Sequence, residues 1–208
     1  MKLTRLTRAD YRRMPWRNGG GWTTEIARSP ADGDDFDWRL SLAEITADGP
    51  FSRFDGCARS LVLLQGAGME LRIDGAPRLV DRRGQVVAFD GAAEVHCRLL
   101  DGPTRDFNVI TRRDRADHRV MFRPLVGPMV LFPERGVQWL VHVVSGEARQ
   151  QHAGDDGLLA GSGDTLWLED DGAGRQCVLS GGGELLLVRL QDVRDGRATP
   201  GETPPHVA

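Results

Sequence analysis

Apolar and polar residues alternate over short stretches of the chain, and most of these stretches end at Gly, Pro or Asp. A period of two places successive side chains on opposite faces of a β-strand. The first series of expected strands covers 38–45, 61–64, 70–73, 85–89, 95–100 and 106–111. A second series covers 138–144, 148–151, 165–168, 177–179 and 184–190. Helical periodicity is confined to 7–14, so the pattern predicts an all-β protein.

The two series of expected strands resemble each other. The segment LVLLQGAGMELR around Gly66 is similar to LVHVVSGEARQQ around Gly146, and the closing strands DFNVITR and ELLLVRL also correspond. Each series has an apolar strand, a glycine turn, an alternating strand and a return strand, which is typical of a jelly-roll β-sandwich. The predicted units are an N-terminal half over 1–113, a connector over 114–136, a C-terminal half over 137–194 and a flexible tail over 195–208.

Composition agrees with a turn-rich globular chain and excludes several classes of partner. The 208 residues include 26 Gly and 11 Pro, while a hydrophobic content of 40% is too high for a disordered chain. A net charge of −3 argues against a nucleic-acid partner. Apolar runs are too short for a membrane span. The charged N-terminus and three scattered cysteines predict a cytoplasmic protein with free thiols.

The tandem architecture resembles a bicupin, and most cupins hold a metal ion through histidines and a glutamate at fixed spacing. Counting back from Gly66 places Arg59 at the glutamate position, and the same count from Gly146 reaches Trp139. Residues 52–55 contain no histidine, and the five histidines of the chain show neither HxH nor i, i+4 spacing. We therefore expect no metal and no other cofactor. Arg59 instead offers a guanidinium that suits an anionic small molecule.

The segment PWRNGGGWTTEIA, residues 15–27, places three glycines after Asn18. Glycines allow positive φ and can gather backbone N–H groups into an anion-binding nest, although a simple turn is the plainer interpretation. Beyond the turn, Thr23 and Glu25 share one face of an extended segment.

Two of the expected strands carry rows of polar side chains. Arg39 and Ser41 share a face of 38–45, and Asp106 and Asn108 share a face of 106–111. These rows either face solvent or line the polar end of a barrel interior, where buried polar groups need partners.

Four segments together resemble the HutD/Ves family: PWRNGGGWTTEIA, WRLSLAEITADGPFSRFDGCARSLVLLQGAGMEL, FDGAAEVHCRLLDGP and DFNVITRR. The similarity is dense over 11–113 and looser over 114–194. It implies a metal-free bicupin, and some members are encoded with histidine-utilisation enzymes and are thought to bind a small pathway metabolite. The positions that the resemblance marks for ligand binding are Trp16, Asn18, Gly19, Gly20, Thr23, Glu25, Arg39, Ser41, Arg59, Asp106, Asn108 and Arg113.

We therefore expect a metal-independent protein that binds a small carboxylate such as urocanate or formylglutamate and regulates or assists histidine utilisation. Arg39 or Arg59 would hold the carboxylate, and Glu25 would order the arginines. The alternative is a metal-independent isomerase, epimerase or hydrolase with Glu25 or Asp106 as general base. A third interpretation is an interaction module without a pocket function, and the sequence also leaves room for a homodimer.

Overall fold

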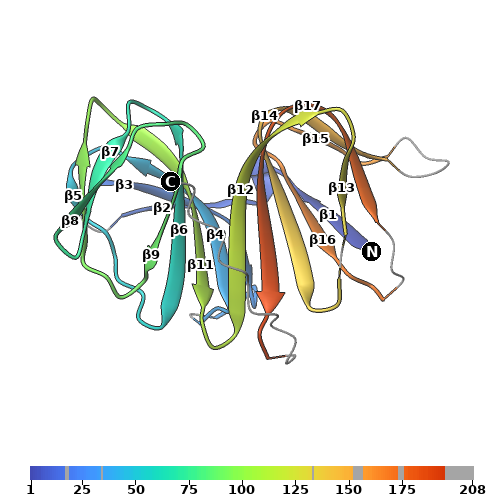
Figure 1. The fold of residues 1–208 in the computed structure, drawn as a ribbon, viewed down its shortest axis with the longest axis horizontal. Helices are drawn as coiled ribbons and strands as arrows, with labels where there is room; N and C mark the ends of the chain where they lie inside the picture. The colour runs from blue at the N-terminus through green and yellow to red at the C-terminus, as the bar shows by residue number, and fades with distance from the viewer. Residues whose placement is uncertain (17–18, 34, 133, 152–156, 173–175, 195–208) are drawn as a thin grey trace, which may run out of the picture.

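Two β-rich halves lie side by side in the computed structural model, which describes residues 1–16, 19–33, 35–132, 134–151, 157–172 and 176–194 (Figure 1). Three antiparallel sheets of six, four and seven strands make up the molecule. The short 3₁₀ helix η1, Arg8–Asp10, interrupts the strands near the N-terminus. The all-β prediction is confirmed. Within the described ranges, no helix is both long and apolar enough to cross a membrane.

The N-terminal half consists of a six-stranded sheet that faces a four-stranded sheet. The six-stranded sheet has the order β2 (Arg12–Pro15), β3 (Gly21–Ser29), β4 (Trp38–Ile45), β11 (Thr104–Arg112), β6 (Cys57–Gln65) and β9 (Val86–Asp90). The four-stranded sheet has the order β5 (Gly49–Pro50), β10 (Val95–Leu99), β7 (Met69–Ile73) and β8 (Ala76–Val80). Apolar side chains of both sheets, among them Leu61, Met69 and Leu71, fill part of the space between them.

The C-terminal half is built on one seven-stranded sheet. Its main path runs β1 (Lys2–Leu6), β16 (Thr165–Glu169), β14 (Val137–Gln151), β17 (Cys177–Asp192) and β12 (Ala116–Val126). Two short strands complete it, β13 (Met129–Leu131) on β17 and β15 (Leu159–Gly161) on β14.

Several segments pair differently from the sequence expectation. The first strand, β1, pairs with β16, so the N-terminus lies in the C-terminal half (Figure 1). The segment 116–126, expected to be part of a connector, forms β12 and pairs along β17. The helical expectation for 7–14 is wrong except for η1, where the Thr7 N–H donates to Asp10 Oδ2 at 2.8 Å. The expected tail, 195–208, lies outside the described residues.

Strands β14 and β17 each join two of the expected strands into one long, bent strand. The expected turn at Gly146 lies inside β14, opposite Gly183 of β17. Gly146 has a φ of +78°, and a Cβ there would collide with the carbonyl oxygen of Gly182. Glycine is therefore required because the two strands approach closely where they bend, rather than because the chain reverses.

The two halves share a hydrophobic core. Leu40, Phe107 and Val109 on the outer face of the six-stranded sheet belong to one buried cluster with Leu186 and Val188 of β17. The six-stranded sheet is consequently covered on both faces, which explains why β4, β6 and β11 are buried along almost their whole length. Polar side chains on its inner face are therefore enclosed by protein.

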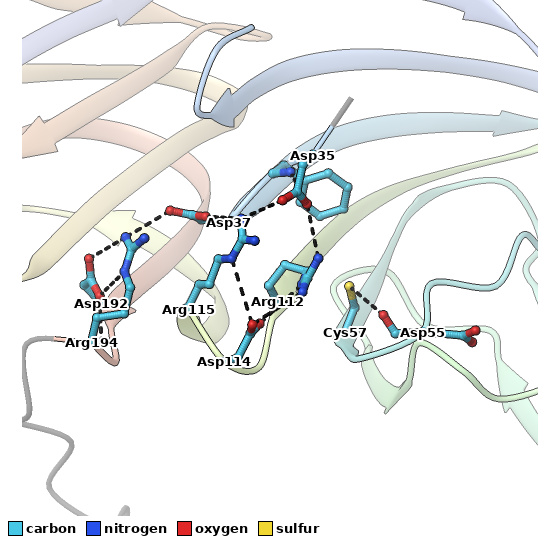
Figure 2. A network of polar contacts seen from close by, with 10 residues as sticks. Asp35, Asp37, Asp55, Cys57, Arg112, Asp114, Arg115, Asp192 and Arg194 are labelled. Carbon is cyan, nitrogen blue, oxygen red and sulfur yellow. Dashed lines mark hydrogen bonds and ion pairs between the residues drawn. The ribbon is translucent and has the colours of Figure 1, made fainter. Parts of the chain in front are cut away.

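A network of ion pairs joins the halves at one end of their shared core (Figure 2). Arg115, in the turn before β12, lies 2.8 Å from Asp35 Oδ2 and 3.1 Å from Asp37 Oδ1, both before β4. Arg194, after β17, lies 2.9 Å from Asp37 Oδ2 and 2.8 Å from Asp192. The network thus connects three segments that are distant in the sequence.

Candidate functional site

The six-stranded and four-stranded sheets of the N-terminal half together form a barrel, which we call the N-terminal barrel. The polar rows of β3, β4 and β11 lie on the inner face of the six-stranded sheet, inside this barrel. Glu25 is opposite Ser41, and Ser41 is opposite Asn108, so the three side chains form a row across the sheet. Asp106 follows on the same face of β11, and Arg59 lies on the same face of β6. Ser41, Arg59, Asp106 and Asn108 are all buried, with Asp106 completely inaccessible. The rows therefore line the barrel interior rather than face solvent.

Arg59 is held at the centre of this cluster by two hydrogen bonds and three aromatic rings. Its Nη1 donates to the carbonyl oxygen of Ser52 at 2.9 Å, and Nη2 donates to Asn108 Oδ1 at 3.2 Å. The guanidinium carbon lies 5.7, 5.3 and 4.9 Å from the ring centroids of Phe51, Phe54 and Phe89, within the range of cation–π contact. Burial lowers the pKa of Arg59 to about 10, so the group stays charged at neutral pH.

Asp106 continues the chain of contacts through Asn108. The Asn108 amide Nδ2 donates a short hydrogen bond to Asp106 Oδ1, while its Oδ1 accepts from Arg59. Burial raises the pKa of Asp106 to about 7, an effect that the nearby positive charge of Arg59 opposes. Asp106 can therefore exchange a proton near neutral pH, unlike an ordinary aspartate.

Two polar atoms of the cluster are buried and have no hydrogen-bond partner in the part of the chain that the structure describes. They are Arg59 Nε, which is a donor, and Asp106 Oδ2, which accepts when the carboxyl group is ionised and can donate when it is protonated. Buried polar atoms without partners are unusual in proteins and costly to stability. Their presence in one cluster is the strongest structural indication of a ligand site.

Glu25 and Arg39 form an ion pair on the same face. Arg39 Nε donates to Glu25 Oε2 at 2.6 Å, and the side chains are 18% and 14% exposed. This pair is the part of the row that solvent reaches. Glu25 therefore orders Arg39, as expected, whereas Arg59 is ordered by Asn108 and the backbone.

The residues before β3 form a wall of the same interior. Trp16 Nε1 donates to Thr23 Oγ1 at 2.7 Å, and the indole packs edge-on against Phe51 with centroids 6.2 Å apart. The Gly19 N–H donates to the Trp16 carbonyl at 3.1 Å, and the Gly20 carbonyl accepts from Thr46 N–H at 3.0 Å. These bonds close a turn, and the anion-binding nest stays a prediction. Asn18 lies outside the described residues.

Arg113 is the one predicted site residue that the structure places elsewhere. It comes directly after β11, is exposed, and pairs with Asp90 at 3.0 Å. It lines a separate cavity of about 450 Å³ together with Asp117 and Arg189. Arg113 is an odd number of residues from Asp106 and Asn108, so strand alternation would not place it in their inward-facing row.

The sequence interpretation did not include the aromatic surroundings of Arg59. Phe54 and Phe89 contact its guanidinium, and the Ser52 carbonyl accepts from it. Phe89 is opposite Arg59 in the β6–β9 register, so a correct pairing of these two strands would have revealed it. Phe54 lies in a loop, where the alternation of side chains gives no guide.

The donor set of the barrel does not suit a divalent cation. Two guanidinium groups, Arg39 and Arg59, occupy the interior together with the carboxylates of Glu25 and Asp106. Across the described residues, no three His, Cys, Asp or Glu side chains are grouped so that they could hold a metal ion. Positive side chains at the centre favour an anion instead.

Comparison with known proteins places the chain in a family. The family model HutD matches residues 8–187. The chain belongs to the HutD family. A relative from Pseudomonas putida, an uncharacterised 21.2 kDa protein in the hutC 3′ region, is 46% identical over 124 residues. The match covers 59% of this chain and 65% of the relative, so the chain spans just under two thirds of that relative. Protein Ves of Citrobacter koseri is 36% identical over 185 residues, or 87% and 92% of the two chains.

Solved structures of the HutD family and of other proteins share the fold. HutD from Pseudomonas fluorescens SBW25, in a formate condition, has a TM-score of 0.80 at 35% identity and covers 92% of this chain and 99% of its own. The bacterial pirin YhhW of Escherichia coli, in complex with nickel(II), has a TM-score of 0.67 at 12% identity over 91% and 99% of the two chains. The second likeness concerns the fold alone, and together they confirm the predicted bicupin architecture.

Proposed function

We propose that this HutD-family chain binds a small carboxylate inside its N-terminal barrel and serves as a regulatory or accessory protein of histidine utilisation. The observation that carries the proposal is Arg59, a buried and charged guanidinium whose Nε has no partner among the described residues. A carboxylate is the natural partner of such a group because it accepts charge-assisted hydrogen bonds from guanidinium N–H groups.

The remaining side chains define what else the ligand would meet. Asp106, beside Arg59 through Asn108, is a hydrogen-bond donor when protonated and would then bond to a ligand oxygen without repelling it. Trp16, Phe51 and Phe89 offer apolar and aromatic walls. A ligand would reach the cluster past the Arg39–Glu25 pair, where the row is partly exposed.

Urocanate and formylglutamate are the candidate ligands. Each combines a carboxylate with a polar group that Asn108, Ser41 or Asp106 could bind. The link to histidine utilisation is supported by the relative in the hutC 3′ region and by the solved HutD structure. Two or three charge-assisted bonds of about 1.5–3 kcal/mol each would together contribute roughly 3–9 kcal/mol to binding, before the entropy costs of association.

Calorimetric titration of the purified protein with urocanate and formylglutamate tests the proposal. We expect binding that Arg59→Met weakens about tenfold or more, because one charge-assisted bond is worth at least that factor. Arg53→Met is the matched control, since Arg53 is exposed and lies 3.8 Å from Asp55, outside the barrel. Absence of heat and of any melting shift at millimolar concentrations of both ligands would reject the proposal.

A catalytic role is the second candidate, and the raised pKa of Asp106 favours it. A carboxyl group with a pKa of about 7 is suited to general acid–base chemistry at neutral pH. Glu25 is less available because its carboxylate holds Arg39 at 2.6 Å. Turnover of urocanate or formylglutamate that is lost in Asp106→Asn, with binding retained, would favour an enzyme over a binding protein.

A further inference from the structure

A polar cavity lies between the two halves, on the opposite face of the six-stranded sheet from Arg59. This interhalf cavity has a volume of about 230 Å³. Arg105 of β11 and Thr24 of β3 line it from the N-terminal half, and His142 of β14 lines it from the C-terminal half. Arg8 of η1 and Tyr11 lie at the segment that crosses between the halves.

Positive charge dominates the interhalf cavity. Its lining includes Arg8, Arg13 and Arg105 against one carboxylate, Glu44, which is paired with Arg13 at 2.8 Å, while the nearby Asp164 carboxylate is paired with Arg5 at 2.8 Å. Arg105 Nε is buried and has no partner in the described part of the chain. Among the described residues, the Arg8 side chain makes only a long hydrogen bond, 3.5 Å, from Nη2 to the Ser162 carbonyl. Two guanidinium groups are thus left to bind an anion.

The hydrogen bonds around Tyr11 favour one tautomer of His142, the one in which both close contacts of the Tyr11 hydroxyl are satisfied. The Tyr11 hydroxyl donates its one proton to the Gly163 carbonyl at 2.9 Å, because a carbonyl can only accept. Thr165 Oγ1, 2.7 Å from Tyr11 Oη, must then donate to Tyr11. The single hydroxyl proton of Thr165 is then directed at Tyr11. His142 Nδ1, which lies 2.9 Å from Thr165 Oγ1, therefore donates to that oxygen.

Neutral His142 therefore carries its proton on Nδ1 and presents a lone pair at Nε2. Burial, together with the positive charges of Arg105 and Arg8, lowers the pKa of His142 to about 3, which keeps the ring neutral. The cavity consequently combines two cationic donors with one buried neutral acceptor, since His142 is 4% exposed. A plain anion would satisfy the arginines and leave Nε2 unbonded.

We propose that the interhalf cavity is a second ligand site, which binds a small carboxylate that also carries an N–H or O–H donor. Arg105 and Arg8 hold the carboxylate, and His142 Nε2 accepts from the donor. Both halves contribute to the site, so its ligand is bound across their junction. The site shares no side chain with the barrel cluster around Arg59 and does not depend on it.

The test uses the full-length Arg59→Met protein, in which the barrel site is disabled, and two probes. N-acetylglycine has a carboxylate and an N–H, and levulinate has the same skeleton with a methylene in place of the N–H. We expect N-acetylglycine to bind at millimolar concentrations and levulinate to bind several-fold more weakly. The ¹⁵N resonance of His142 Nε2 should shift with N-acetylglycine only.

Variants on the same background locate the binding. Arg105→Met and Arg8→Met should each weaken N-acetylglycine about tenfold, the effect of one charge-assisted bond, while the exposed Arg78→Met should leave it unchanged. If one of the two arginine variants does not fold, the other alone is enough to locate the binding. Three results would overturn the proposal: no binding to the Arg59→Met protein, equal affinity for the two probes, or unchanged binding in the arginine variants. Loss of binding in Arg59→Met, with retention in a protein that carries Arg105→Met as its only substitution, would assign the probe to the barrel instead.

Discussion

At the scale of single residues, the site depends on an arginine and an aspartate that are buried near each other without a direct bond. Asn108 lies between them, accepting from Arg59 and donating to Asp106. This arrangement leaves Arg59 Nε and Asp106 Oδ2 without partners among the described residues. A direct Arg59–Asp106 pair would satisfy both groups and lower the pKa of Asp106, so the spacing by Asn108 keeps both available to a ligand.

The affinity for formylglutamate should fall as the pH rises through about 7. Below that value Asp106 is protonated and donates to the ligand, whereas above it the carboxylate repels the anion. If binding requires the proton, affinity drops up to about tenfold per pH unit above the pKa of Asp106. Titrations between pH 6 and pH 9 measure this slope.

Asp106→Asn is the control for that pH dependence. The amide retains an acceptor for Asn108 and a donor for the ligand but does not titrate in this range. Its affinity should therefore be flat with pH, and an equally steep slope in Asp106→Asn would show that another group is responsible.

At the scale of secondary structure elements, alternation predicted most strands, and β4 matches 38–45 at both ends. The same alternation could not tell whether Arg39 and Ser41 face solvent or an interior, because both surroundings produce the same period. The packing of distant segments decides between the two, because the C-terminal half covers the opposite face of the sheet. The pairing of β1 with β16 could not be predicted either, because the alternation of side chains within a strand does not indicate which distant strand it pairs with.

The bend of β14 and β17 provides a stability test at this scale. Gly146→Ala should cost roughly 2–4 kcal/mol of unfolding free energy, since it adds a methyl group against a backbone carbonyl at a left-handed φ. Gly102→Ala is the matched control, with φ of +65° and open space around its Cβ, and should cost about 1 kcal/mol. Equal losses in urea unfolding would show that the close approach of the strands is unimportant.

At the scale of the whole molecule, the two halves act as one unit because they share a core and an ion-pair network. The core fixes the outer face of the sheet whose inner face carries Arg59. The network around Arg115 and Asp37 joins the start of β4 to the end of β17 (Figure 2).

Arg115→Met should lower the melting temperature, because it removes the contacts to Asp35 and Asp37 at once. The loss should shrink at high salt, where exposed ion pairs are screened. Arg98→Met, which removes one exposed contact of 3.4 Å to Glu70 within the N-terminal half, should change the melting temperature little. A salt-independent loss in Arg115→Met would point to packing rather than charge.

The central claim, that Arg59 holds a carboxylate inside the N-terminal barrel, is tested most directly by a crystal structure grown with saturating formylglutamate. We expect a ligand carboxylate oxygen about 2.7–2.9 Å from Arg59 Nε, the usual length of a charge-assisted bond, with Asp106 Oδ2 in contact with the same ligand. A ligand bound only outside the barrel, or an interior without ligand at saturation, would contradict it.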